Sequence, residues 1–278
     1  MAKRSSNNKI VRSKLDGLTL HVYKPSRKIE GLLVVLHGNS RNAADYCRSA
    51  MALADERALM VIAPHFDARR FPPSSYHRGN LVDRRQHPRP PSEWTTRFVP
   101  RIIEWGASRC EFSGIPVYLV GFSAGAQYLS RVAAFERLPG VVSIVIASPS
   151  SHVLPLLGLP PQGERVPYGM TGLVDDPETA RQMLKAYLRR QITLYIGSED
   201  DDPRDPLLTR NPAALRQGRD RLERAFFTYQ TARTNAKRHG WTCNWRLIVE
   251  ADIGHSPKRL LSPQRFTDVF AVAETADC

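Results

Sequence analysis

The sequence predicts an α/β fold in which a mainly parallel sheet carries helices on both of its faces. Two observations support this. Short runs rich in Val, Ile and Leu alternate with segments whose apolar residues recur every three or four positions. Runs 32–36 and 142–147 are apolar nearly throughout, which is typical of strands covered on both sides. The predicted strands are 18–23, 32–36, 59–63, 117–120, 142–147, 193–196 and 245–249.

The helical segments carry recognisable start and stop signals. Pro177 follows Asp175 and Asp176, either of which can cap a helix that begins with proline. Gly240 follows His239, where a helix-ending glycine is expected. The predicted helices are 42–57, 96–110, 124–137, 177–190, 213–239 and 263–276.

Two proline-rich stretches, 66–95 and 148–176, interrupt this alternation and are too long to be simple connectors. The sequence has no internal repeat, no domain linker and no low-complexity tract. A length of 278 residues suits one large α/β domain. We therefore expect a single domain over 1–278 with loop insertions near 66–95 and 148–176.

The net charge is +13, which favours anionic partners through long-range attraction. The arginines are spread from end to end, however, and the strongest local groups are short or interleaved with acids: Arg69-Arg70, Arg84-Arg85 and the segment 216–238. A nucleic-acid footprint requires clustered charge. We therefore expect no dedicated nucleic-acid function, whereas an anionic substrate fits the charge.

Hydropathy, the N-terminal segment and the cysteines narrow the class of protein further. No run of 18 apolar residues occurs, so we expect no transmembrane helix and no membrane partner. Residues 1–17 are basic but lack the apolar stretch of a secretory signal, which predicts a cytoplasmic protein if they are the native start. Cys47, Cys110, Cys243 and Cys278 are scattered without a CxxC pair, so we expect free thiols and no metal site.

The strongest chemical signal is Gly121-Phe122-Ser123-Ala124-Gly125. It directly follows a predicted strand and directly precedes a predicted helix. A serine on such a sharp strand-to-helix turn is lifted clear of the sheet, and the flanking glycines relieve the crowding. The alternative is a glycine-rich tight turn with an idle serine. The strand–turn–helix context favours Ser123 as a nucleophile.

A serine hydroxyl needs a base, and His255 is the favoured candidate. It lies in a loop after the last predicted strand, at the same carboxyl edge of the sheet as Ser123. His152, which also follows a strand, is the main competitor. His239 lies at a helix end and is more typical of a capping or surface residue. A further three histidines remain possible substrate contacts: His65, His77 and His87.

The base needs an orienting carboxylate, and the run Glu199-Asp200-Asp201-Asp202 follows the strand 193–196 at the same edge. Asp200 is the first choice and Asp202 the second, because Glu199 and Asp201 are expected to point elsewhere. The alternatives are an exposed acidic loop or a weak calcium site. The glycine and glutamate that an EF-hand loop requires are not at the right positions.

An acyl-transfer site also needs preplaced N–H donors for the oxyanion. The backbone N–H of Ala124, directly after the nucleophile, is one candidate. The strand 32–36 leads into His37-Gly38-Asn39, and we expect the N–H of Asn39 to be the second donor, with Gly38 giving room. Taken alone, the same segment could be an ordinary strand-to-helix turn.

Together these residues resemble the α/β-hydrolase family. The matching pieces, in order, are His37-Gly38, the pentapeptide 121–125, Gly-Ser-Glu-Asp at 197–200 and Gly254-His255. The order Ser, Asp, His is the order of the family. The resemblance spans roughly residues 18–276. It implies the α/β-hydrolase fold and a triad of Ser123, His255 and Asp200.

The segment LHGNSRNAADYCRSA, residues 36–50, also resembles the early part of feruloyl-esterase and polyhydroxyalkanoate-depolymerase-like members. The chain departs from those secreted enzymes because it shows no signal peptide and no paired-cysteine signature. This departure argues against a polymeric extracellular substrate.

The expected activity is a two-step serine hydrolysis of a small-molecule carboxylic ester that needs no cofactor. An amidase or peptidase using the same site is the close alternative. A non-catalytic binding protein on the same fold is the other, although no triad member is missing. Trp94 and Tyr76, in the insertion 66–95, are candidates for shaping the acyl or alcohol pocket. For Trp94, simple anchoring of the following helix is equally consistent with the sequence.

Overall fold

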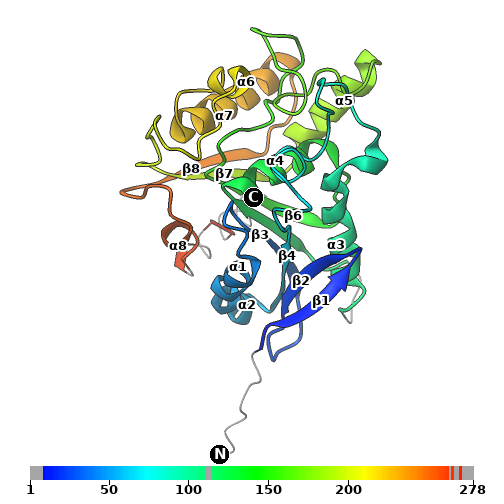
Figure 1. Ribbon diagram of the computed structural model, residues 1–278, viewed down its shortest axis with the longest axis vertical. Helices are drawn as coiled ribbons and strands as arrows, with labels where there is room; N and C mark the ends of the chain where they lie inside the picture. The colour runs from blue at the N-terminus through cyan, green and yellow to red at the C-terminus, as the bar shows by residue number, and fades with distance from the viewer. Residues whose placement is uncertain (1–8, 111–113, 263, 266–268, 271–278) are drawn as a thin grey trace, which may run out of the picture.

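The computed structural model describes residues 9–110, 114–262, 264–265 and 269–270, and an eight-stranded sheet forms its centre (Figure 1). The order of the strands across the sheet is β1-β2-β4-β3-β5-β6-β7-β8. The strands are β1 (Val11–Leu15), β2 (Leu18–Tyr23), β3 (Gly31–Leu36), β4 (Leu59–His65), β5 (Val117–Phe122), β6 (Val141–Ala147), β7 (Ile192–Gly197) and β8 (Trp245–Glu250).

Six adjacent strands of the sheet are parallel to one another: β4, β3, β5, β6, β7 and β8. At one edge, β2 pairs antiparallel with β4, and β1 pairs antiparallel with β2. This confirms the predicted mainly parallel sheet. The carboxyl ends of β3, β5, β7 and β8 meet along one edge, so the loops that follow them lie near one another although they are far apart in sequence.

Helices cover both faces of the sheet (Figure 1). One face packs against α1, α2 and α8, and the other against α3, α4, α5 and α7. The helices are α1 (Ala43–Ser49), α2 (Met51–Arg57), α3 (Phe98–Ala107), α4 (Ala124–Phe135), α5 (Pro177–Leu188), α6 (Pro212–Leu215), α7 (Arg221–His239) and α8 (Pro257–Leu260); short 3₁₀ turns span Pro91–Glu93 and Thr95–Arg97.

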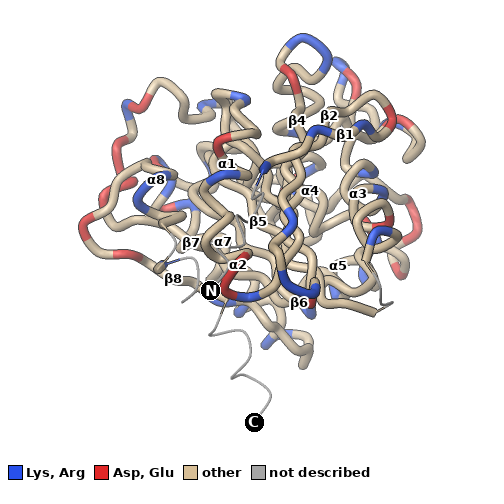
Figure 2. Tube along the Cα trace, turned by 90° about the horizontal axis from the view of Figure 1, so that it is seen from below, with Lys and Arg blue, Asp and Glu red and all other residues tan. Residues whose placement is uncertain are grey.

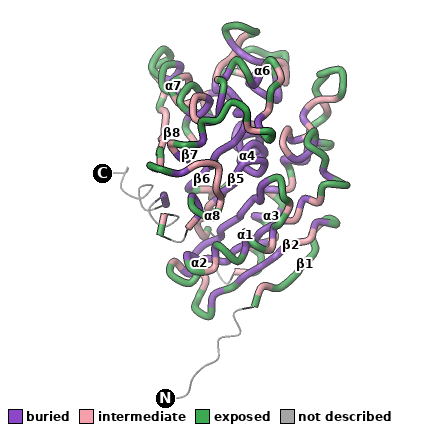
Figure 3. The backbone as a smooth tube through the Cα atoms, turned by 60° about the vertical axis from the view of Figure 1, so that its left-hand side comes forward, coloured by how far each residue is buried: buried purple, intermediate pink, exposed green. Residues whose placement is uncertain are grey.

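Alternation along the strands sends neighbouring side chains to opposite faces. Along β3, Leu32, Val34 and Leu36 join one apolar cluster, and Leu33 and Val35 join the other. All of β3 is buried, as Figure 3 shows for the central strands, where buried segments lie inside an exposed outer layer of loops. The apolar runs therefore correspond to strands covered on both sides.

Three predictions about the elements were wrong. Strand β1 was missed because its side chains are largely exposed and carry no apolar run, although the left-handed Asp16-Gly17 turn that joins it to β2 is a hairpin signal. The helix expected over 42–57 is divided at Ala50 into α1 and α2. The helix expected over 213–239 is interrupted at Gly218, whose φ of 147° is incompatible with a helix.

After that interruption, Asp220 starts α7 anew by accepting a hydrogen bond from the Glu223 N–H at 2.8 Å. The helix expected over 263–276 lies mostly outside the described residues. No helix in the part of the chain that the structure describes is both long and apolar enough to span a membrane.

The charge of the molecule is spread over many segments, and Figure 2 shows Lys and Arg alternating with Asp and Glu around the periphery. Three arginines are nevertheless fully buried: Arg131, Arg221 and Arg224. The guanidinium of Arg131 donates to the carbonyls of Pro167 and Ser151, both at 2.9 Å. It thereby attaches the insertion 148–176 to α4.

Candidate active site

Ser123 lies on the sharp turn between β5 and α4, as predicted from the pentapeptide. Its backbone has φ 54° and ψ −111°, a sparsely populated conformation for a residue with a side chain. Hydrogen bonds hold it on both sides: its N–H donates to Ala147 O at 2.9 Å, and its carbonyl accepts from Gln127 N–H at 2.9 Å. Hydrogen bonds to β6 and from the first turn of α4 thus stabilise the strained backbone conformation of Ser123.

The two glycines of the pentapeptide are required by close backbone contacts. A Cβ at Gly121 would lie 2.5 Å from the carbonyl oxygen of Gly125. A Cβ at Gly125 would lie 2.3 Å from the carbonyl oxygen of Leu36 and 2.6 Å from that of His37. Helix α4 therefore packs directly on the end of β3, which brings the Ser123 turn against the loop that carries Asn39.

The structure brings Ser123, His255 and Asp200 together. His255 Nε2 lies 3.1 Å from Ser123 Oγ, and His255 Nδ1 lies 2.8 Å from Asp200 Oδ2. The ring of Phe122 supports the imidazole, with centroids 4.8 Å apart. Asp200 is 3% exposed and Ser123 7% exposed. The arrangement allows His255 to take a proton from Ser123 while Asp200 holds the imidazole.

The loops that carry Asp200 and His255 are joined to each other by backbone hydrogen bonds. Ser198 N–H donates to Glu250 O at 2.8 Å, and Glu199 N–H donates to Ile253 O at 2.9 Å. Gly197 allows this approach, because a Cβ there would lie 1.9 Å from Ile253 O. The hydrogen bonds between the loops that follow β7 and β8 thus set the distance between the Asp200 carboxylate and the His255 imidazole.

Of the acidic residues in this loop, only Asp200 contacts His255 in the described structure. Asp202 is exposed and faces Arg204, with 3.6 Å between the charged atoms. Glu199 and Asp201 are exposed as well. The geometry therefore favours Asp200 over the second choice, Asp202.

Of the two proposed oxyanion donors, Asn39 follows β3 and Ala124 begins α4, the two elements that the Gly125 contact joins. The amides of Asn39 and Ala124 have no hydrogen-bond acceptor among the described residues, which leaves both free to donate to a substrate. Ala124 is the first residue of α4, so its amide is one of the unpaired donors at a helix N-terminus. Their role in binding an oxyanion stays a prediction.

The histidine before Gly38 fixes this loop in place. His37 Nδ1 lies 2.9 Å from Gly38 O, and Nε2 lies 3.1 Å from the Phe66 amide. Since the amide can only donate, Nε2 accepts and Nδ1 carries the proton. Burial lowers the pKa of His37 to about 3. This neutral imidazole links the ends of β3 and β4.

Tyr76 and Trp94 have packing roles, in place of the substrate contacts considered from the sequence. Tyr76 is fully buried; its hydroxyl donates to His37 O at 2.7 Å, and its ring stacks on Phe66 at 4.8 Å. Trp94 is 8% exposed, and its Nε1 donates to Arg89 O at 2.8 Å. Both side chains hold the insertion 66–95 on the protein.

His152, the main competitor as base, does not contact Ser123. It is 1% exposed, and neither ring nitrogen has a hydrogen-bond partner in the described structure. Burial, with Arg131 and Arg224 nearby, lowers the pKa of His152 to about 3. Burial and neighbouring arginines also lower the pKa of His77 to about 3. These side chains are neutral, structural histidines.

Two residues at this site were missed from the sequence: Arg221 and Asp205. Arg221 Nη1 lies 3.1 Å from Asp200 Oδ1 and 2.6 Å from Asp205 Oδ2. Arg221 is the first residue of α7, and neither residue belongs to a recognisable motif, although Asp205 follows the Gly-Ser-Glu-Asp segment 197–200 on the same loop. The only local signal is Asp220, whose capping pattern places a helix start next to Arg221.

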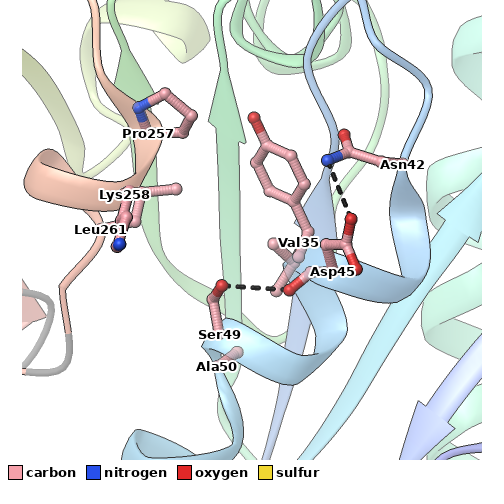
Figure 4. Close-up of a pocket in the computed structure, with 9 residues that line it drawn as sticks. Val35, Asn42, Asp45, Ser49, Ala50, Pro257, Lys258 and Leu261 are labelled. Atoms are coloured by element: carbon pink, nitrogen blue, oxygen red, sulfur yellow. Dashed lines mark hydrogen bonds between the residues drawn. The ribbon is translucent and has the colours of Figure 1, made fainter.

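A groove of about 330 Å³ lies between α1 and α8 (Figure 4), and none of the residues that line it belongs to the triad. Helix α1 follows the Asn39 loop, and α8 begins two residues after His255. The floor of the groove is apolar and its rim is polar. The floor is formed by Val35, Tyr46, Ala50, Pro257 and Leu261, and the rim by Asn42, Asp45, Ser49 and Lys258.

Comparisons with solved structures place this architecture among hydrolases. LpqC, a poly(3-hydroxybutyrate) depolymerase from Bordetella parapertussis, is 28% identical with a TM-score of 0.81, over 94% of this chain and 90% of that one. Poly(aspartic acid) hydrolase-1 from Sphingomonas sp. KT-1 is 27% identical with a TM-score of 0.78, over 91% and 92%. No family model matches the chain, and no curated protein matches its sequence.

An S-formylglutathione hydrolase from Agrobacterium tumefaciens shares the fold at 15% identity and a TM-score of 0.56, over 95% of this chain and 94% of that one. The chain is thus an α/β-hydrolase by fold, and its structural neighbours are esterases and related hydrolases. The expected resemblance to polyhydroxyalkanoate-depolymerase-like members agrees with the likeness to LpqC.

Replacing Gly125 with alanine is expected to destabilise the protein by at least about 3 kcal/mol, because the new Cβ meets two backbone carbonyls that cannot move independently of β3. Urea denaturation followed by circular dichroism measures the change. Gly114→Ala is the control: nothing lies within 4 Å of its Cβ, so only the strain of its φ of 77° remains. Equal losses in both variants would contradict the packing argument.

The buried neutral histidines predict a loss of stability in mild acid. The folded-state pKa values of His37, His77 and His152 are about 3, well below the unfolded value of 6.5. As the pH falls below 6.5, the unfolded chain binds protons that the folded chain does not. Each histidine should then lower the free energy of unfolding by about 1.4 kcal/mol per pH unit.

Urea denaturation at pH 7.5 and pH 5.5 tests this, since carboxylates stay ionised over that range. The variant His77→Gln should lose less than about a third of the dependence, because burial lowers the pKa of His21 as well. A free energy of unfolding that stays constant between these pH values would show that the histidines are protonated in the folded protein.

Proposed function

We propose that the protein is a serine hydrolase that cleaves carboxylic esters. The observation that carries the proposal is the continuous chain of contacts from Ser123 Oγ through the His255 imidazole to Asp200, at the carboxyl edge of an α/β-hydrolase sheet. Ser123 supplies the nucleophile, His255 the base and Asp200 the orienting carboxylate. The esterase neighbours support the same class of reaction.

In the first step Ser123 Oγ attacks the ester carbonyl carbon and His255 Nε2 takes the hydroxyl proton. The amides of Asn39 and Ala124 receive the oxyanion of the tetrahedral intermediate. The intermediate then collapses: the bond to the alcohol oxygen breaks, and His255 returns the proton to the departing alcohol. The product of this step is an acyl-enzyme on Ser123.

In the second step water attacks the acyl carbon while His255 again accepts a proton. The same two amides bind the oxyanion of the second tetrahedral intermediate. His255 then gives the proton to Ser123 Oγ as the carboxylic acid leaves. The Ser123 proton leaves with the alcohol through His255, and a proton of the attacking water replaces it through the same imidazole. The scheme therefore requires no cofactor.

The groove between α1 and α8 supports a substrate with an apolar portion. Its lining includes Asn42, three residues after Asn39, and Pro257, two residues after His255, and its floor is apolar. Apolar floors with a few polar groups at the rim are typical of small-molecule sites. We assign the groove to the acyl or alcohol chain of the ester.

Amide hydrolysis at the same site is the second candidate, and one observation favours it. A structural neighbour at 27% identity is a poly(aspartic acid) hydrolase, and the backbone of poly(aspartic acid) is an amide. The net charge of +13 suits an anionic substrate of this kind. An ester is preferred because an alcohol is a better leaving group than an amine and depends less on protonation by His255.

The central prediction concerns Ser123. The wild-type protein should hydrolyse p-nitrophenyl esters and be labelled by a fluorophosphonate, whereas Ser123→Ala should lose at least about 1,000-fold in kcat and all labelling. A parallel panel of p-nitroanilides separates ester from amide hydrolysis. A folded wild-type protein that is inert to the probe and to both panels would support a binding protein on this fold instead.

Filling the groove should change chain-length preference. Ser49 is exposed and lines the rim, so Ser49→Phe places a ring in the groove without disturbing the core. The ratio of kcat/KM for p-nitrophenyl octanoate over acetate should fall about 10-fold, which corresponds to the loss of one or two buried methylenes. The neighbouring exposed Arg48 does not line the groove, and Arg48→Phe is the control. A ratio that falls equally in both variants would contradict the assignment.

A further inference from the structure

The carboxylate of Asp200 has two oxygens, and only one of them faces His255. The other, Oδ1, accepts from Arg221 Nη1 at 3.1 Å. The same nitrogen donates to Asp205 Oδ2 at 2.6 Å, so one guanidinium bridges two carboxylates. Asp200 and Arg221 are both buried, with side chains 2% exposed. The triad acid therefore belongs to a cluster of three ionisable groups, of which Asp200 and Arg221 are buried and Asp205 is partly buried.

The start of α7 holds Asp200 through its backbone as well. Leu222 N–H donates to Asp200 O at 3.2 Å, so consecutive residues of the first turn contact the carbonyl and the carboxylate of one aspartate. Asp205 orders the rest of the loop, because its Oδ1 accepts from Leu207 N–H at 2.7 Å. The orientation of Asp200 is thus determined from outside the triad.

The contacts of Arg221 are confined to this cluster. Its Nε and Nη2 are buried and have no hydrogen-bond partner within the described part of the chain. Burying a guanidinium is costly unless charged partners compensate it. Its side-chain partners are Asp200 and Asp205 alone among the described residues, so the stability of its position depends on both.

The charges around His255 come from several elements. The loop after β7 contributes Asp200 and Asp205. Burial opposes the lowering of the Asp205 pKa, the hydrogen bond from Arg221 is the main cause that lowers it, and the charge of His255 contributes. Arg210, on the same loop, donates to Asp205 O at 3.2 Å. Helix α7 contributes Arg221 and, beyond it, Asp220 and Arg224. On the side of β5, the imidazole faces Ser123 and the uncharged Phe122 ring.

We propose that Arg221 and Asp205 are positioning residues for the triad: they fix the Asp200 carboxylate toward His255 and set the pH range in which His255 acts as a base. The inference rests on the proposed serine hydrolase activity. Arg221 cancels one of the two negative charges near His255. Without it, both carboxylates favour the protonated imidazole, which cannot accept the Ser123 proton.

Asp205 acts in the opposite direction. Removing its charge leaves Arg221 paired with Asp200 alone, and the local field then favours the neutral imidazole. The two residues therefore predict shifts of opposite sign in the pH dependence of catalysis. A residue that only stabilises the fold would change the amount of active protein and leave the midpoint of the pH profile in place.

The experiment measures kcat/KM against pH for a p-nitrophenyl ester. In Arg221→Gln the midpoint of the acidic limb should move up by about half to one pH unit, and in Asp205→Asn it should move down by a similar amount. Arg221→Lys keeps the charge and should restore the wild-type midpoint, with a lower kcat because an ammonium cannot reproduce the guanidinium geometry.

Arg204→Gln is the matched control, since it removes the same charge from an exposed position on the same loop and should leave the midpoint unchanged. Midpoints that stay at the wild-type value in Asp205→Asn and Arg221→Gln, or that shift in the same direction, would overturn the inference. If Arg221→Gln does not fold, the downward shift in Asp205→Asn decides. Absence of Ser123-dependent hydrolysis in the wild-type protein would instead reject the proposed function.

Discussion

The site depends on one close contact between two segments of backbone. The Cα of Gly125 lies against the carbonyls of Leu36 and His37, where no residue with a Cβ could fit. This contact sets the start of α4 against the end of β3, so the Ser123 turn and the Asn39 loop become neighbours. The strained backbone of Ser123 persists because hydrogen bonds to Ala147 and from Gln127 hold both of its sides. The nucleophile and the two candidate oxyanion donors are thus placed by backbone packing.

Buried arginines hold the loops around the site, including the loop that carries Asp200. The three buried arginines perform two tasks: Arg131 and Arg224 donate to backbone carbonyls of loops, and Arg221 holds two carboxylates. A guanidinium can reach several acceptors at once because its five donors lie in one plane. Burial and these neighbours also keep the His152 ring neutral. Part of the positive charge of the chain therefore lies in the interior of the protein. The net charge of the sequence is thus larger than the charge that the surface offers to a partner.

Much of the fold was predictable because its signals are local. The central strands are apolar along their whole length, and the segment 18–23 matches β2 at both ends. The Ser123 turn was predictable because its neighbours in sequence are also its neighbours in space. The predictions were wrong where a local pattern competed with backbone geometry: Gly218 divides an apparently continuous helical pattern, and the exposed edge strand β1 has no apolar pattern to detect. Tyr76 was suggested as a substrate contact, but aromatic residues in a long loop are equally suited to anchor it.

By itself, the sequence determined most of the elements and which residue types reach the carboxyl edge of the sheet, since strand periodicity and turn chemistry act over a few residues. Only the tertiary structure decided which carboxylate faces the imidazole, because the sequence ranks Asp200 before Asp202 but does not place either side chain until the loops after β7 and β8 are joined. The same holds for Arg221, which reaches Asp200 across 21 residues, and for Ser123 and His255, which are 132 residues apart. The direction of a side chain across such separations is set by packing between loops, and no pattern along the chain encodes it.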